Sequence, residues 1–396
     1  MKIKSENNIS SILFYGAFCD KHHKITTGQT VVSSIIIKEL EKSYSVYKVN
    51  IADRTTASRG SLSFTILRTL HFLGLFLKLF LLLSFKKVDV VYYQLVYSKI
   101  GIIRDHIAIR ILALFNKPVC GHALGITKIE EIISSSAQLK RMCNWNYAHI
   151  NRIIVEGEEM KSNFKVFPNA ETKVAVIPNG LNEEFPENKE PKRYDITKPF
   201  KVLYLSNLIF SKGYYDVLRA IDILVNKDHL DVECMFAGRF YRTLEAEDND
   251  DNFYGKEAFD FYLVEHNLIN RVKYKIGLYG EEKKDAFLES NVFVLPTYYS
   301  GEGQPMAILE AMSYGCVPLV TPHGHIPIMV NEENGCIVEP KSPGSIALRI
   351  KELINDSELY TKKSANSLND FKAKFKGDVF SNKIKNEIIN VFESII

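Results

Sequence analysis

The sequence has few of the features that mark several common functional classes. Its six cysteines are scattered and none forms a C-x2-C pair, which argues against a zinc site and predicts a reducing compartment. Residues 1–10 are polar and the apolar run at 12–15 is short, so no cleavable signal peptide is expected. No G-x-G-x-x-G fingerprint is present, and basic and aromatic residues are not interleaved as on a nucleic-acid surface.

The charge is unevenly distributed over 396 residues, a length that suggests two or three domains. Residues 1–180 contain 24 Lys and Arg against 13 Asp and Glu, a balance of +11, whereas the remaining residues contain 26 against 34, a balance of −8. A basic half predicts contact with an anionic surface, and a phospholipid leaflet is favoured over nucleic acid.

The most apolar stretch, residues 62–85, favours this choice. Arg68, His71 and Lys78 interrupt it at spacings of three and seven, along one side of a helix. The pattern is typical of an amphipathic helix in a membrane interface. An ordinary helix packed on a sheet fits equally well, and both interpretations hold if only part of the helix is covered. A transmembrane span is not favoured, because of the charges.

Strand and helix patterns alternate along the whole chain, which predicts an α/β protein with doubly wound parallel sheets. The polar, proline-containing run at 181–199 resembles a linker between two such domains. Strands are expected at 12–15, 46–50, 88–94, 118–121, 152–155, 174–177, 202–205, 236–238, 272–277, 292–295, 317–320 and 335–338. Helices are expected at 30–41, 62–85, 100–115, 128–149, 158–164, 281–290 and 375–396.

The stretch 292–320 carries the strongest indication of chemistry. A buried strand at 292–295 leads through the loop 297–304 to Pro305, which suits a first helical position. Gly315 ends the helix before the next strand. The free amides of Gly303, Gln304 and Met306 would then face a ligand, and a diphosphate suits this place.

Two carboxylates accompany this helix start. Glu302 and Glu310 are separated by seven residues, so they cannot share one helical face and would reach two parts of one ligand. Carboxylates accept paired hydroxyl hydrogen bonds, as sugars and ribose offer. A lone E-x7-E usually represents solvated acids, but here the strand, loop, proline and glycine all agree with a binding site.

This signature and the Ile177-Pro178-Asn179-Gly180 segment resemble retaining glycosyltransferases of family 4. The resemblance is strongest over residues 174–340. It implies the GT-B architecture, with two Rossmann-like parallel-sheet domains facing a cleft. Residues 1–178 plus about 373–396 would form the acceptor-side domain, and residues 179–372 the nucleotide-sugar-binding domain.

The resemblance also implies roles for individual residues. Glu302 would bind the donor sugar and Glu310 the ribose, while Lys212 and the segment Gly303, Gln304, Pro305 and Met306 would bind the diphosphate. His122 would contact the sugar, and Gly28 would lie in a loop near donor and acceptor. The family usually has an arginine where this chain has Asn207, and Arg239, after Gly238, is a candidate replacement. Each of three residues also has a purely structural interpretation. His122 could be a hydrogen-bonded structural histidine, Gly28 a plain turn glycine, and Lys212 a solvated lysine.

A D-x-D pair, Asp248 and Asp250, is a candidate for holding a divalent metal ion. It lies in a polar, acid-rich insertion and does not follow an apolar strand, so a solvated loop is favoured. We therefore expect no metal and no cofactor apart from the nucleotide-sugar substrate.

The resemblance predicts metal-independent, retaining transfer of a hexosyl group from a nucleotide-diphosphate sugar. The acceptor would be a saccharide or lipid-linked saccharide of surface polysaccharide assembly (capsule or O-antigen), in the cytoplasm at the inner face of the plasma membrane. A peripheral membrane contact is expected, and no nucleic-acid partner. Two alternatives stay open: a nucleotide-sugar 2-epimerase of the same fold, and a non-catalytic binding protein on the same scaffold.

Overall fold

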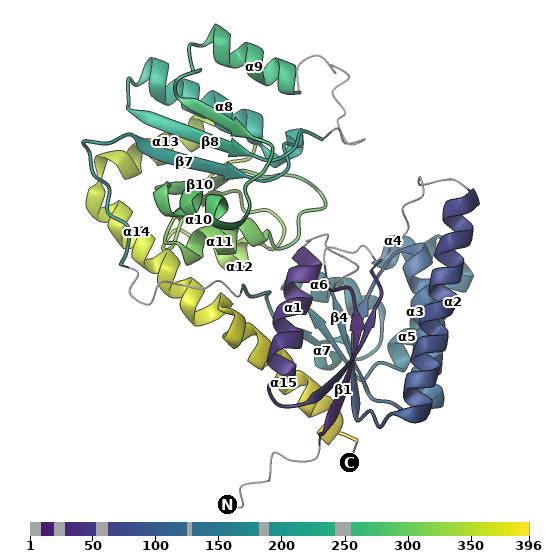
Figure 1. The fold of residues 1–396 in the computed structure, drawn as a ribbon. Helices are drawn as coiled ribbons and strands as arrows, with labels where there is room; N and C mark the ends of the chain where they lie inside the picture. The colour runs from purple at the N-terminus through teal and green to yellow at the C-terminus, as the bar shows by residue number, and fades with distance from the viewer. Residues whose placement is uncertain are drawn as a thin grey trace, which may run out of the picture. The chain divides into compact units, whose positions relative to one another are not determined.

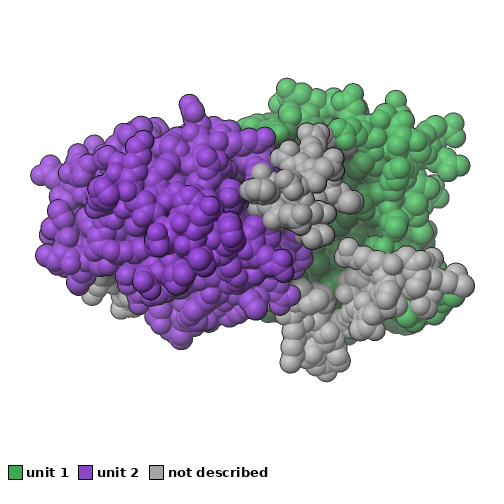
Figure 2. All heavy atoms as spheres, turned by 90° about the horizontal axis from the view of Figure 1, so that it is seen from above, with its two compact units in different colours: residues 1–182, 377–396 green, residues 183–376 purple. Residues whose placement is uncertain are grey.

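The computed structural model describes residues 9–19, 28–52, 62–124, 129–181, 190–241 and 255–395, without the side chains of 28 and 62–65. The chain forms two units, residues 1–182 with 377–396 and residues 183–376, which are coloured separately in Figure 2. The two boundaries between the units therefore lie a few residues after positions 178 and 372, where the sequence analysis expects the chain to pass from one domain to the other.

The first unit contains a six-stranded sheet in the order β2-β1-β3-β4-β5-β6, and its described pairings are all parallel. Nearly every residue of the central strands is buried, which explains their continuous apolar sequences. The strands are β1 (Ser11–Gly16), β2 (Ser45–Asn50), β3 (Val90–Leu95), β4 (Val119–Ala123), β5 (Arg152–Val155) and β6 (Val174–Val176).

Helices cover both faces of this sheet. The first-unit helices are α1 (Gly28–Leu40), α2 (Leu62–Phe85), α3 (Lys99–Leu114), α4 (Ile129–Ser134), α5 (Ala137–Ala148), α6 (Glu158–Ser162), α7 (Ala170–Lys173) and α15 (Gly377–Glu393). Helices α2, α3 and α5 pack side by side on one face, and α1 and α15 lie together on the other (Figure 1). The last helix therefore returns to the first unit, and Arg152 Nε donates to Glu387 Oε2 at 2.7 Å.

Two expectations for this unit need correction. The helix expected at 128–149 is broken, because Ser135 binds back to the carbonyl of Ile132 and Ser136 caps the start of α5 by accepting from Leu139 N. His122, expected just past strand β4, lies inside it, paired in register with Gln94 and Ile154.

Helix α2 agrees with both interpretations of its sequence. One stripe, Leu75, Leu79 and Leu83, is buried in the core of the first unit. Most of the remaining apolar side chains are exposed, including Leu73 at 57% and Leu77 at 60%. By length and composition, Ile66–Phe85 could also cross a membrane, although the buried leucine stripe fits a helix that is covered on one side.

The second unit has a sheet in the order β12-β11-β10-β7-β8-β9, again with parallel pairings throughout its described part. The order places β7 beside β10, so the direction of strand addition reverses between them. The strands are β7 (Phe200–Leu205), β8 (Val232–Ala237), β9 (Val272–Lys275), β10 (Val292–Leu295), β11 (Val317–Val320) and β12 (Cys336–Ile337).

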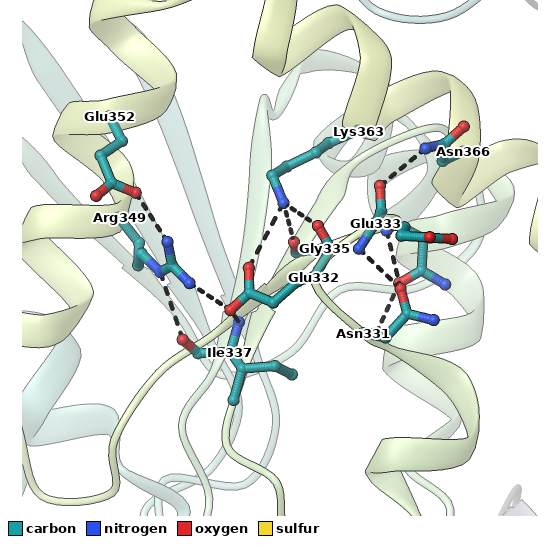
Figure 3. A network of polar contacts seen from close by, with 10 residues as sticks. Asn331, Glu332, Glu333, Gly335, Ile337, Arg349, Glu352, Lys363 and Asn366 are labelled. Carbon is teal, nitrogen blue, oxygen red and sulfur yellow. Dashed lines mark hydrogen bonds and ion pairs between the residues drawn. The ribbon is translucent and has the colours of Figure 1, made fainter.

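The helices of this unit are α8 (Tyr214–Asp222), α9 (Lys256–Glu265), α10 (Gly280–Glu289), α11 (Met306–Ser313), α12 (Ile326–Met329), α13 (Pro343–Asn355) and α14 (Ser357–Asp370). A polar network fastens α13 and α14 to the loop 331–335 (Figure 3). The buried Lys363 of α14 donates to the carbonyl of Gly335 at 2.7 Å, and Arg349 of α13 pairs with Glu332 and Glu352. The network lies next to β12, the edge strand on the side of the sheet away from β9.

Candidate active site

The loops that follow β7 and β10 meet where the strand order reverses. In open α/β sheets this reversal point, at the carboxyl ends of the strands, is where ligands bind. Tyr298 N donates to the carbonyl of Ser211 at 2.7 Å, which ties the two loops together. Gly213, with φ of +76°, lies so close that an added Cβ would be 2.6 Å from the carbonyl oxygen of Pro296. Side chains from both loops are therefore held at one point.

Lys212 and Glu302 form an ion pair across these loops. Lys212 Nζ lies 3.2 Å from Glu302 Oε2 and 3.3 Å from Ser206 Oγ, while Thr297 Oγ1 donates to Glu302 Oε2 at 3.0 Å. Glu302 is only 6% exposed, although the sequence places it in a loop. A buried, hydrogen-bonded charge of this kind is held in one orientation and is not a solvated acid.

The loop after β11 packs against the backbone of the loop that carries Glu302. Gly324 has φ of +54°, and a Cβ there would be 2.5 Å from the carbonyl oxygen of Glu302. His323 Nε2 lies 2.7 Å from the carbonyl oxygen of Tyr299, and Thr321 Oγ1 donates to the carbonyl of Thr297. Only a residue without a side chain allows this approach at position 324.

Helix α11 begins one residue later than the sequence suggests. Pro305 has φ of −66° but ψ of 113°, so its backbone is extended and it is the N-cap, not the first helical residue. No side chain caps the helix among the described residues. The positive end of the helix dipole is therefore available to an anion. Gln304 is buried beside Glu302, and Gly303 and Met306 are partly exposed.

Glu310 pairs with a residue that the sequence analysis missed. Lys283 Nζ, from α10, lies 2.5 Å from Glu310 Oε1, and the carboxylate is 13% exposed. Lys283 lies outside every motif, so nothing in the sequence marked it. The two glutamates thus have different cationic partners, Lys212 and Lys283.

The loop after β8 runs beside the loop after β7. Leu208 N donates to the carbonyl of Arg239 at 2.7 Å. At Gly238, where φ is +151°, a Cβ would be 1.8 Å from the carbonyl oxygen of Ser206. The side chains of Asn207 and Arg239 are exposed and pair with no described side chain. The structure therefore gives Gly238 a packing reason and leaves Arg239 available for an anion.

His122 is fully buried in the first unit. Its Nδ1 lies 2.6 Å from the hydroxyl oxygen of Tyr92, and its Nε2 has no partner among the described residues. Burial lowers the pKa of His122 to about 4, against the opposing charge of Glu156, so the ring is neutral at neutral pH. Gly28 begins helix α1, and residues 20–27 before it lie outside the described part.

No group of three or more His, Cys, Asp or Glu side chains suited to a metal ion exists in the described part of the chain. Asp248 and Asp250 lie outside that part.

Comparisons with known proteins agree with this geometry. Residues 186–370 match the model of the family "Glycosyl transferases group 1". The capsular polysaccharide biosynthesis glycosyltransferase CapM of Staphylococcus aureus is 28% identical over 204 residues, 48% of this chain and 48% of that protein. The chain thus matches about half the length of this relative.

Solved structures show the same fold over nearly the whole chain. Anabaena HepE in complex with UDP-glucose has a TM-score of 0.64 at 18% identity, covering 95% of this chain and 98% of that one. Sucrose-phosphate synthase of Thermosynechococcus elongatus has a TM-score of 0.68 at 14% identity, covering 97% and 100%. The two six-stranded parallel sheets are those of the GT-B fold, as the sequence predicts.

Proposed function

We propose that the chain, whose residues 186–370 match the model of the group 1 glycosyltransferases, transfers a hexosyl group from a UDP-sugar to a saccharide acceptor. The bound UDP-glucose of the similar HepE structure supports the choice of donor. The likeness to CapM supports an acceptor of capsular polysaccharide synthesis.

The observation that carries the proposal is the ion pair between Lys212 and the buried Glu302, beside the uncapped start of α11. The Lys212 ammonium and the helix amides would stabilise the charge on the departing diphosphate, as preorganised donors do in other active sites. Glu302 would hold the hydroxyl groups of the sugar, and Glu310 those of the ribose. Arg239 would supply the second positive charge, in place of the arginine that the family usually has at the position of Asn207. Gly238 would keep the loop of Arg239 in place.

The proposed reaction retains the anomeric configuration. The bond between the anomeric carbon and the phosphate oxygen breaks, and its electron pair leaves with the diphosphate. The acceptor hydroxyl attacks the anomeric carbon from the same face, and its proton passes to an oxygen of the departing phosphate. Lys212 would contribute most in this step because the negative charge develops near its ammonium. The roles of His122 and Gly28 stay predictions from the family resemblance.

We further propose that the acceptor is lipid-linked and that the protein works at the inner face of the plasma membrane. The exposed apolar side of α2 supports this, together with exposed Ile100, Ile103 and Ile107 on the neighbouring α3. Between residues 62 and 115 the only acids are Asp89 and Asp105, and the side chain of each is nearly buried. An apolar face with basic and almost no acidic neighbours suits an anionic leaflet.

Substitution of the ion pair tests the function. We expect Lys212→Met and Glu302→Gln each to lower kcat for UDP-glucose turnover by about 100-fold or more. Turnover is measured as UDP release, and the product is analysed for a new glycosidic bond. Lys201→Met is the matched control, since Lys201 is a partly exposed lysine that pairs with the exposed Glu289 at the amino end of β7, away from the site.

Unchanged donor binding and turnover in both ion-pair variants would refute the proposal and favour a binding protein. UDP release with epimerisation at C2 and no acceptor product would favour the epimerase.

A further inference from the structure

Two hollows lie side by side along helix α2 and share Gly74 and Lys78 in their walls. The first has a volume of about 440 Å³ and is lined by Phe18, Lys48, Asn50, His71, Gly74, Leu75 and Lys78. The second has a volume of about 500 Å³ and is lined by Tyr47, Gly74, Leu77, Lys78, Leu81, Leu82, Phe85 and Lys86. Because they share lining residues, they form one groove, which we call the α2 groove.

The first hollow has a largely apolar wall into which basic side chains are set. Lys48, His71 and Lys78 contribute to its wall, and none of the described residues that line it is acidic. Lys48 also pairs with Glu41 at 2.7 Å, so the charge of one of the two lysines is partly neutralised. Asn50 is the last residue of β2 and Phe18 follows β1, so this end of the groove lies at the carboxyl edge of the sheet. Parallel sheets bind their ligands at that edge.

The second hollow is apolar. Leu77, Leu81 and Phe85 are 60%, 44% and 79% exposed, and Lys86 lies at the far end. From Lys78 to Lys86 the helix rises roughly 12 Å, away from the carboxyl edge. The groove therefore becomes more apolar along its length, from Lys48, Asn50 and His71 at one end to the exposed leucines and Phe85 towards the other, where Lys86 stands at the rim.

Gly74 keeps the two hollows connected. A glycine inside a helix is less favourable than an alanine. At Gly74 an added Cβ would meet no atom within 4 Å, so no packing against its neighbours requires glycine. Because the position lines both hollows, a side chain there would stand in the groove.

We infer that the α2 groove binds a membrane lipid with a phosphate or diphosphate head and a hydrocarbon tail. The head lies between Lys48, His71 and Lys78, and the tail follows Leu77, Leu81 and Phe85. Ammonium groups bind phosphates as point charges. The apolar wall can bury a hydrocarbon tail, which a free phosphate does not have. The inference rests on the proposed function only in identifying this lipid as the carrier of the acceptor saccharide.

The experiment measures binding of geranylgeranyl diphosphate to the full chain by titration calorimetry. Inorganic diphosphate, which has no tail, and geranylgeraniol, which has no head, are the two partial probes. We expect the complete lipid to bind at least tenfold more tightly than either. Gly74→Leu should abolish this preference by filling the groove, and Lys78→Gln should weaken binding of the complete lipid severalfold without improving that of geranylgeraniol.

Gly344→Leu is the matched control, because Gly344 also lies in a helix and a Cβ there meets nothing within 4 Å. Thermal stabilisation by UDP-glucose, which reports on the second unit, should be the same in all variants. Gly74→Leu should still bind vesicles of anionic phospholipid, since the exposed apolar side chains of α2 are all retained.

Equal binding of the lipid by wild type and Gly74→Leu would overturn the inference, as would equal affinity for inorganic diphosphate. Either result leaves the proposed transfer reaction untouched, because that reaction depends on Lys212 and Glu302.

Discussion

At the scale of single residues, Lys283 orients a carboxylate that we assign to the donor. Glu310 is 13% exposed and has Lys283 Nζ at 2.5 Å, so removal of the lysine leaves a poorly solvated charge near the expected diphosphate. We expect Lys283→Met to raise KM for UDP-glucose about tenfold with little change in kcat, and Lys283→Arg to restore most of the affinity. Steady-state kinetics measure both constants.

Lys284→Met provides the control on the same helix, because Lys284 pairs with the exposed Glu281. A fall in kcat at unchanged KM would contradict a role for Lys283 in donor binding.

Asp216, on α8, predicts a stability change that depends on pH. Burial raises the pKa of its carboxyl to about 6, against the opposing charges of Arg219 and Lys341. Because the pKa is raised in the folded state, the contribution of Asp216 to the free energy of unfolding is fully present below pH 3.8, and it is lost as the pH rises through about 6. Asp216→Asn should therefore stabilise the protein by on the order of 2–3 kcal/mol at pH 7.5 and not at pH 3.5.

Chemical denaturation of both proteins at the two pH values measures this difference. A gain of the same size at both values would show that the ionisation of Asp216 is not its source.

At the scale of elements, the loop after β11 fixes the position of Glu302. Gly324→Ala would place a Cβ 2.5 Å from the carbonyl oxygen of Glu302 and would have to displace that loop. Since a displacement of about 1 Å can cost roughly 100-fold in rate, we expect kcat to fall 10- to 100-fold with a smaller loss of thermal stability.

Gly280→Ala is a close control for this change. Gly280 has the same φ of +54°, but a Cβ there meets nothing within 4 Å. Both variants therefore carry the same backbone strain, and an equal loss of activity in the two would exclude displacement of Glu302 as the cause.

The elements also show how far the sequence could predict the structure. The strands β5, β10 and β11 have the predicted bounds, because their apolar runs are continuous and end at turn residues. The break between α4 and α5 was missed, since the helical pattern continues through the serines and only their hydrogen bonds interrupt it. Local hydrogen bonding of this kind is not visible in periodicity.

The candidate site was predictable in part for a similar reason. Lys212 and Glu302 lie in recognisable segments, and the structure brings their side chains together. That they pair with each other, and that Lys283 reaches Glu310, depends on contacts between residues far apart in the sequence. The burial of Glu302 could not be predicted, because its loop is polar and the loop after β11, which packs against its backbone, is distant in the sequence.

At the scale of the whole molecule, the chain leaves the first unit once and returns to it with α15. Phe380, Ile384 and Ile388 of α15 are fully buried, and the helix packs on α1, β3 and β4. The core of the first unit therefore depends on residues at the far end of the sequence. Lys212, Glu302 and Glu310, which we propose to bind the donor, lie in the second unit, whose internal contacts do not include this helix.

This separation predicts that damage to α15 will leave donor binding intact. Ile384→Asp buries an unpaired charge, which should destabilise the first unit by several kcal/mol. In hydrogen exchange, β1, β3 and β4 should lose protection, whereas UDP-glucose should still protect β7, β10 and α11. Lys383→Asp, at an exposed position of the same helix, should change neither. Loss of UDP-glucose protection in the second unit of Ile384→Asp would mean that donor binding depends on the core of the first unit, contrary to the division proposed here.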